Sequence, residues 1–111
     1  MKQKLEVKTG AKEQTLFVKA LGNYPLLRVI DFLMTFQEFD YSPTDIAKNA
    51  DVSFITLQTF WDNLVRLELV KKTRRVGNAT LYKLNLESEI VRKLLELDSV
   101  LRERYRKRAL N

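Results

Sequence analysis

The chain has 111 residues, of which 45% are apolar and 31% charged, with a formal net charge of +6 and neither histidine nor cysteine. This length fits one domain with a single modest core. Without histidine and cysteine, the commonest general base is missing, as are the imidazole and thiolate ligands of zinc sites. The three glycines are too far apart to build a phosphate-binding loop. We therefore expect no enzyme, no metal site and no cofactor.

Charged residues are unevenly distributed along the chain. Residues 71–85 carry five basic residues and no acidic one, both ends are also basic, and residues 23–70 are acidic on balance. A polyanion should therefore be attracted first to residues 71–85 and to the ends. The start of the chain lacks the apolar run of a signal peptide, and no run approaches the roughly 20 residues that span a bilayer. We expect a cytoplasmic protein without a membrane contact.

The N-terminal third of the chain predicts an arm and two helices. Residues 1–11 are rich in lysine and alternate only weakly, which indicates a basic N-terminal arm, with an edge strand as the alternative. Residues 12–21 predict a short helix that Gly22 ends, and Asn23 is suited to cap the next helix. That helix, over residues 24–36, is apolar on most sides. It must be covered by the helices that follow it and also by the N-terminal helix or a second subunit.

A short helix follows a connection in which a short strand at Tyr41 is one option. Ser42 is a suitable cap, Pro43 fits the first helical position, and Asp45 lies where the acidic partner of a capping box stands. The helix is predicted to end near Ala50.

A second helix is predicted from a cap at Ser53 to about Leu67, after a turn at Asp51-Val52. Its apolar side chains are spaced three or four apart and should form one buried face. That face consists of Leu57, Phe60, Trp61, Leu64 and Leu67. The other side carries Phe54, Ile55, Gln58, Thr59 and Asp62.

The basic stretch after this helix predicts a β-hairpin. One strand begins at Val70, and a tight turn is expected at Val76-Gly77-Asn78, because glycine and asparagine tolerate positive φ. The return strand covers residues 79–84, where Thr80, Tyr82 and Leu84 alternate on one face as in a half-buried strand.

Two short helices followed by a basic hairpin form the outline of a winged helix-turn-helix. The phrases that carry a closer likeness are Leu21-Gly22-Asn23-Tyr24-Pro25 leading into Leu27-Arg28-Val29-Ile30, then Ser42-Pro43-Thr44-Asp45-Ile46-Ala47, Val52-Ser53 and Leu69-Val70-Lys71-Lys72. In these, over roughly residues 15–85, the chain resembles the ArsR- and MarR-type winged helix regulators of prokaryotes. The resemblance implies binding to double-stranded DNA. ArsR-type proteins often sense metals through cysteine and histidine, so metal sensing does not carry over to this chain.

The predicted fold is therefore mainly α with a small β-hairpin (α+β), with a winged helix-turn-helix domain over residues 12–85. Residues 86–111 predict one long helix, reaching about Lys107. Charged residues on it are spaced for two i,i+4 pairs, Glu89 with Lys93 and Asp98 with Arg102. A heptad-like seam indicates a dimer interface, with folding back onto the same domain as the alternative. The seam consists of Ile90, Leu94, Leu97, Leu101 and Tyr105.

Two sets of residues are candidates for contact with DNA. In the resembling families the exposed face of the second helix reads base edges in the major groove. On this helix the candidates are Ser53, Phe54, Ile55, Thr56, Gln58 and Thr59. The hairpin, or wing, would bind the backbone or the minor groove through Lys71, Lys72, Arg74, Arg75 and Asn78. The alternatives are that Phe54 and Ile55 pack inside the protein or against a partner, and that the wing is merely a charged hairpin edge that resists strand pairing.

The sequence thus predicts a sequence-specific transcriptional regulator that binds duplex DNA as a homodimer. The competing hypothesis is a winged helix used as a protein-interaction module in a larger assembly. The acidic helical region and the apolar Phe54-Ile55 pair favour this second hypothesis.

Overall fold

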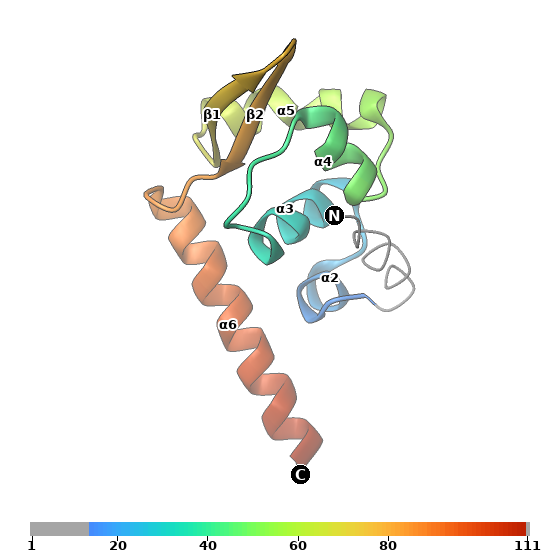
Figure 1. The fold of residues 1–111 in the computed structure, drawn as a ribbon. Coiled ribbons are helices and arrows are strands. Elements are labelled where there is room, and N and C mark those ends of the chain that lie inside the picture. Colours follow the sequence, from blue (N-terminus) through green and yellow to red (C-terminus); the bar gives the residue numbers. More distant parts are fainter. Residues whose placement is uncertain (1–13, 111) are drawn as a thin grey trace.

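The elements follow one another in the order that the sequence predicts. The computed structural model describes residues 14–110, with side chains as far as Lys107. The predicted arm over residues 1–11 lies outside this range. The mainly α fold with a small hairpin is confirmed (Figure 1). Its elements are α2 (Leu16–Leu21), α3 (Pro25–Thr35), α4 (Pro43–Asn49), α5 (Phe54–Arg66), β1 (Val70–Val76), β2 (Ala79–Leu84) and α6 (Glu89–Leu110).

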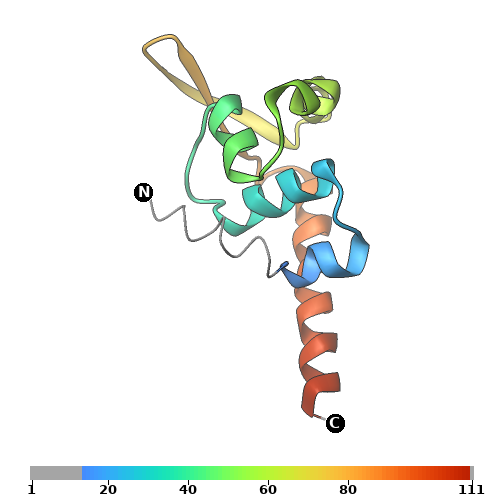
Figure 2. The same cartoon turned by 90° about the vertical axis from the view of Figure 1, so that its right-hand side faces the viewer.

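Helix α3 is the centre of the core. It contacts α2, α4, α5 and β2, which explains why it is apolar on most sides. Its Val29 is fully buried, as are Phe17 of α2, Ile46 of α4, Leu57 of α5 and Val91 of α6. The N-terminal helix α2 is therefore one of the elements that cover α3, which is one of the two possibilities that the sequence predicted. The hairpin and α6 leave this core in opposite directions (Figures 1 and 2).

Three details at the helix ends differ from expectation. Helix α2 begins at Leu16, because Thr15 is its cap and accepts a hydrogen bond from the Val18 amide at 3.3 Å. Tyr24, not Asn23, precedes α3 as its cap residue; the Asn23 side chain instead accepts a hydrogen bond from Arg28 at 2.9 Å. Leu67, expected in the buried face of α5, is 55% exposed because the helix ends there and the chain turns away at the next residue.

The connection between α2 and α3 depends on one glycine. Gly22 ends α2 as predicted, with φ +116°. A Cβ at this position would approach the exposed Tyr24 ring to 2.4 Å, so the ring would have to move, and the positive φ is what favours glycine here.

The hairpin contains an irregularity that the sequence does not indicate. Strands β1 and β2 pair antiparallel, and the turn lies at Gly77-Asn78 with Gly77 at φ 62°. A β-bulge occurs between Lys72 and Arg74, so Thr73 is an extra residue on β1. On the other side of β2, Tyr41 forms a short bridge with Tyr82, in agreement with the option of a strand at Tyr41.

Helix α6 begins three residues later than Leu86, with the Ser88 hydroxyl accepting a hydrogen bond from the Val91 amide at 3.2 Å. It packs along α2 and then continues beyond it (Figure 2). Of the predicted seam, Leu94 and Leu101 pack against the core of their own chain, whereas Ile90, Leu97 and Tyr105 are exposed.

The two ion pairs expected on α6 have different outcomes. Arg102 does pair with Asp98. Lys93, however, pairs with Glu96 at 3.7 Å instead of with Glu89.

Candidate nucleic-acid interface

The first turn of α5 uses its hydroxyl groups to build the helix end. Ser53 Oγ accepts a hydrogen bond from the Thr56 amide at 3.1 Å and donates one to Thr56 Oγ1 at 2.9 Å. The Thr59 hydroxyl donates to the Thr56 carbonyl at 2.6 Å. In contrast, the side-chain amide of Gln58, which lies exposed on the same helix, forms no hydrogen bond with another described residue. Among the polar candidates on α5, Gln58 is therefore the one whose full hydrogen-bonding capacity remains available.

The exposed face of α5 begins apolar and ends acidic. Phe54 is 44% exposed and Ile55 is 75% exposed, so Ile55 does not pack inside its own chain. Gln58, Thr59 and Asp62 are also exposed and continue this face along the helix. The face therefore offers apolar and neutral groups, then the acidic Asp62, and no cation until Arg66 in the last turn.

The hairpin is fixed against α5 by its inner face. Trp61 packs edge-on against Tyr82, with ring centroids 5.1 Å apart and an interplanar angle of 87°. Leu84 and Val70, which pair across the strands, are both buried. This packing holds the wing next to the exposed face of α5.

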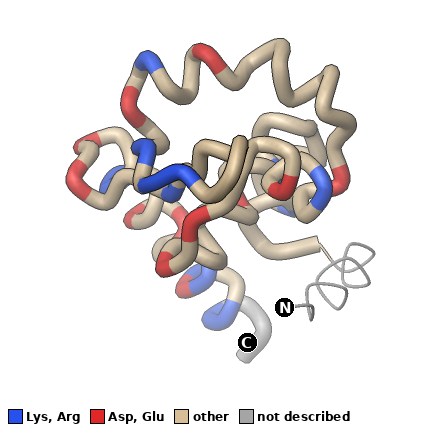
Figure 3. The backbone as a smooth tube through the Cα atoms, turned by 45° about the horizontal axis from the view of Figure 1, so that its top comes forward, with Lys and Arg blue, Asp and Glu red and all other residues tan. Residues whose placement is uncertain are grey.

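Every residue from 71 to 78 is exposed, and this range includes all the predicted contact residues of the wing. Opposite residues of an antiparallel pair share a face of the sheet. By the observed register, Lys71 lies opposite Lys83. Lys72 lies opposite Tyr82, on the face that packs against α5. The basic residues of the wing are therefore divided between two faces. Over the part of the chain that the structure describes, basic positions form several separate groups (Figure 3).

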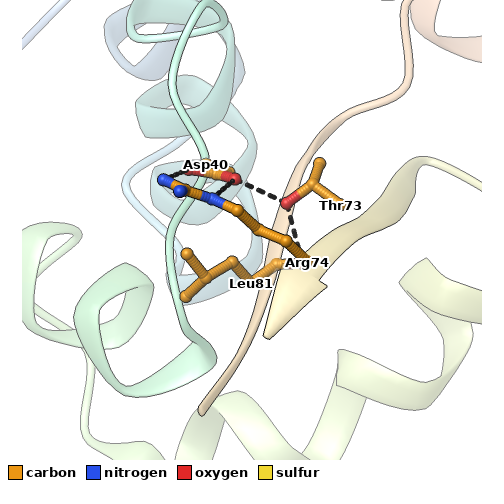
Figure 4. A network of polar contacts seen from close by, with 4 residues as sticks. All are labelled: Asp40, Thr73, Arg74 and Leu81. Carbon is orange, nitrogen blue, oxygen red and sulfur yellow. Dashed lines mark hydrogen bonds and ion pairs between the residues drawn. The ribbon is translucent and has the colours of Figure 1, made fainter. Parts of the chain in front are cut away.

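Arg74 has an acidic partner outside the wing, which sequence reasoning missed. Its Nε lies 3.0 Å from Asp40 Oδ2 and its Nη2 lies 3.2 Å from Asp40 Oδ1 (Figure 4). The Thr73 hydroxyl donates to the same carboxylate at 2.6 Å. Hydrogen bonds from Arg74 and Thr73 lower the pKa of Asp40 from 3.8 to about 2. Asp40 lies 34 positions before Arg74, and no local pattern indicates their contact.

A shallow groove of about 530 Å³ lies between the start of α4, the start of α5 and the wing. Its lining is free of charge and includes Ser42, Thr44, Phe54, Asn78, Thr80 and Tyr82. Phe54 and Asn78 were predicted contact residues, and the fold brings them to one groove. Thr44 and Thr80 were not predicted, because only the docking of the wing brings them together.

Two other kinds of site receive no support from the described part of the chain. Within residues 14–107, no three acidic side chains lie close enough to hold a metal ion. No helix among residues 14–110 combines the length and apolar character needed to cross a membrane.

A β-hairpin that docks beside the second helix of a helix-turn-helix defines the winged helix-turn-helix fold. No family model matches the sequence, and no curated protein matches it. Solved structures with this fold are similar. A mutant of Lactococcus lactis ZitR in apo form has a TM-score of 0.59 and 16% identity, covering 74% of this chain and 64% of that chain. Staphylococcus aureus MepR, a transcription regulator of the multidrug efflux pump MepA, has a TM-score of 0.56 and 16% identity. The alignment covers 72% of this chain and 60% of the MepR chain.

A MepR mutant bound to an oligodeoxyribonucleotide aligns over more of the chain. The TM-score is 0.61 with 17% identity, and the alignment covers 95% of this chain and 74% of that chain. At such identities the likeness shows the fold alone, that of a winged helix-turn-helix. This chain spans less than two thirds of the length of the ZitR chain and of the first MepR chain.

Proposed function

We propose that this protein is a transcriptional regulator that binds specific sites in duplex DNA as a homodimer. The observation that carries the proposal is the exposed face of α5 beside a wing of five basic residues with no acidic one. The similarity to a DNA-bound MepR mutant over 95% of this chain supports it.

In this proposal α5 enters the major groove. Gln58 is suited to bond the edge of adenine, and Phe54 and Ile55 to contact thymine methyl groups. Ser53, Thr56 and Thr59 lie at the start of the helix and would contact phosphate or bases. Because the helix carries an acid at Asp62, most of the affinity should come from the wing and its attraction to phosphate.

Helix α6 is the proposed dimerisation element. Its exposed apolar side chains Ile90, Leu97 and Val100 lie within about 80° of one another around the helix, next to the packed residues Leu94 and Leu101. A second copy would cover this stripe. A two-fold dimer would also present two α5 helices to successive turns of DNA, which raises affinity and favours palindromic sites.

The competing proposal is a protein-interaction module. It is favoured by the exposure of Phe54 and Ile55 at the start of α5 and by the absence of a cation before Arg66. Such a module need not bind DNA. A protein partner with an apolar patch would bind in place of DNA.

The deciding experiment measures binding to a random-sequence duplex by fluorescence anisotropy across a salt series, with the mass determined by light scattering. A regulator should bind with micromolar affinity at low salt and lose affinity steeply as salt rises, by nearly one unit of log–log slope per phosphate contacted. Gln58→Ala should then change the preferred site selected from a random pool. If the folded protein does not bind at low salt, the interaction module is favoured.

The mass measurement tests the dimer with a matched pair of variants. Leu97→Glu should give the monomer mass, since it puts a charge in the exposed apolar stripe. Ser99→Glu changes an exposed residue on the opposite side of α6 and should leave the dimer intact. A dimer that persists in Leu97→Glu would remove this stripe from the interface.

A further inference from the structure

We propose that Asp40 is a positioning residue that withholds Arg74 from nucleic acid, so that Arg75 is the arginine of the wing that contacts DNA. The inference rests on the proposed function and refines it. Sequence reasoning treated Arg74 and Arg75 as equivalent neighbours, but the structure gives them different surroundings.

Arg74 and Asp40 form a two-point contact. Arg74 binds both carboxylate oxygens of Asp40, at 3.0 and 3.2 Å, which is the two-point geometry of a strong arginine–carboxylate pair. The Thr73 hydroxyl donates a third hydrogen bond to this carboxylate at 2.6 Å (Figure 4). The Asp40 side chain is only 17% exposed. Three donors thus hold one carboxylate against the hairpin.

Asp40 is itself held in place by the sheet. It directly precedes Tyr41, whose amide donates to the Tyr82 carbonyl at 2.8 Å and whose carbonyl accepts from the Tyr82 amide at 2.8 Å. The carboxylate therefore stands at a fixed position beside β2, and Arg74 reaches it from β1.

The β-bulge at Thr73 decides where Arg74 points. In a regular ladder continuing from Lys72, Arg74 would lie opposite Thr80. The extra residue Thr73 moves Arg74 opposite Leu81 instead. A bulge commonly redirects a side chain in this way. Here it turns Arg74 to the face where Asp40 lies.

The same shift sends Arg75 to the other face of the wing. Arg75 pairs with Thr80, which shares a face with Tyr82, and Tyr82 packs against Trp61 of α5. Thr80 and Tyr82 also line the groove between the wing and α5. Arg75 therefore lies on the side of the wing that faces the proposed DNA path.

The two arginines differ in whether their charge is compensated. The charge of Arg74 is compensated by Asp40, and a phosphate would have to compete with that carboxylate for the same guanidinium. Arg75 has no acidic partner among residues 14–107, and neither does Lys72 on the same face. Of the two arginines, therefore, only Arg75 has an uncompensated charge, and that charge lies on the face of the wing next to α5.

The test measures the salt dependence of binding to one duplex for four variants: Arg75→Gln, Arg74→Gln, Asp40→Asn and the double variant Asp40→Asn/Arg74→Gln. Each phosphate contact contributes about 0.9 to the slope of log affinity against log salt. Arg75→Gln should lower the slope by about that amount, and Arg74→Gln alone should leave it unchanged. Asp40→Asn should raise the slope by releasing Arg74, and Arg74→Gln should remove this gain.

Two results would overturn the inference while leaving DNA binding established. One is an equal loss of slope in Arg74→Gln and Arg75→Gln; the other is an unchanged slope in a folded Asp40→Asn. Trp61 emission reports whether the hairpin remains docked in each variant, because Trp61 packs on Tyr82. If Asp40→Asn unfolds the hairpin, the comparison of the two arginine variants still decides the question. If the wild-type protein shows no salt-dependent binding, the proposed function fails, and this inference fails with it.

Discussion

Arg28 should be the most important cation for stability, because it joins three segments of the helical core. Its Nε donates to the Ala50 carbonyl at 3.0 Å, its Nη2 to the Asp51 carbonyl at 3.0 Å and its Nη1 to Asn23 Oδ1 at 2.9 Å. It thereby ties α3 to the turn between α4 and α5. The cation also lies at the C-terminal end of α4, where the helix dipole favours positive charge.

The expected cost of removing this side chain follows from these contacts. A hydrogen bond from a charged donor contributes about 1.5–3 kcal/mol when well buried. Two of the three hydrogen bonds of Arg28 are exposed. We therefore assign the lower value of about 1 kcal/mol to every one of the three. Arg28→Met keeps the apolar stem and removes the donors. It should lower the free energy of unfolding by about 3 kcal/mol, or the melting temperature by roughly 10 °C or more.

The assay is urea denaturation followed by far-UV circular dichroism and Trp61 fluorescence. Arg66→Met is the matched control, because Arg66 is exposed and has no hydrogen bond or ion pair with the described residues. The control should change stability by less than about 0.5 kcal/mol. An equally small loss in Arg28→Met, at an unchanged denaturant slope, would refute the assignment of Arg28 as the tie between these segments.

Two further predictions concern stability. The pKa of Asp40 is lowered to about 2, so its stabilising effect is present above about pH 4 and is lost as pH falls toward 2. Allowing for solvent screening, the ionised Asp40 contributes about 1 kcal/mol. The melting-temperature difference between wild type and Asp40→Asn should therefore shrink as pH falls from about 4 and vanish only below about pH 2. A difference that stays constant over this range would contradict the prediction. Glu68 has φ 61°, so Glu68→Gly should stabilise the fold by about 0.5–1 kcal/mol in thermal denaturation. Glu87→Gly, at a residue without positive φ, should not stabilise; a gain there as well would count against the backbone explanation.

Local signals in the sequence predicted the local structure well. Ser42 and Ser53 cap α4 and α5 as expected, since a cap needs only a hydroxyl and an amide three residues on. Gly77 lies in the hairpin turn for the same local reason. These elements determined the winged helix outline, so the fold was predictable.

Contacts between distant segments were not predictable from one sequence. The pair of Asp40 and Arg74 depends on the bulge at Thr73, and nothing in Lys72-Thr73-Arg74 distinguishes a bulged strand from a regular one. Val91 is fully buried, although the heptad spacing selected Ile90, because the packing of α6 on its own domain decides which face is covered. The base-reading assignments on α5 stay predictions.

The length of α6 affects how the molecule moves through solution. With 22 residues the helix is about 33 Å long, and the molecule measures 51 × 31 × 24 Å. Its radius of gyration is 14.3 Å, against about 13 Å for a compact domain of this size. A single copy should therefore diffuse more slowly than a sphere of equal mass and leave a gel-filtration column early. An elution volume calibrated with globular standards would overstate the number of subunits, whereas the scattered light reports the mass directly.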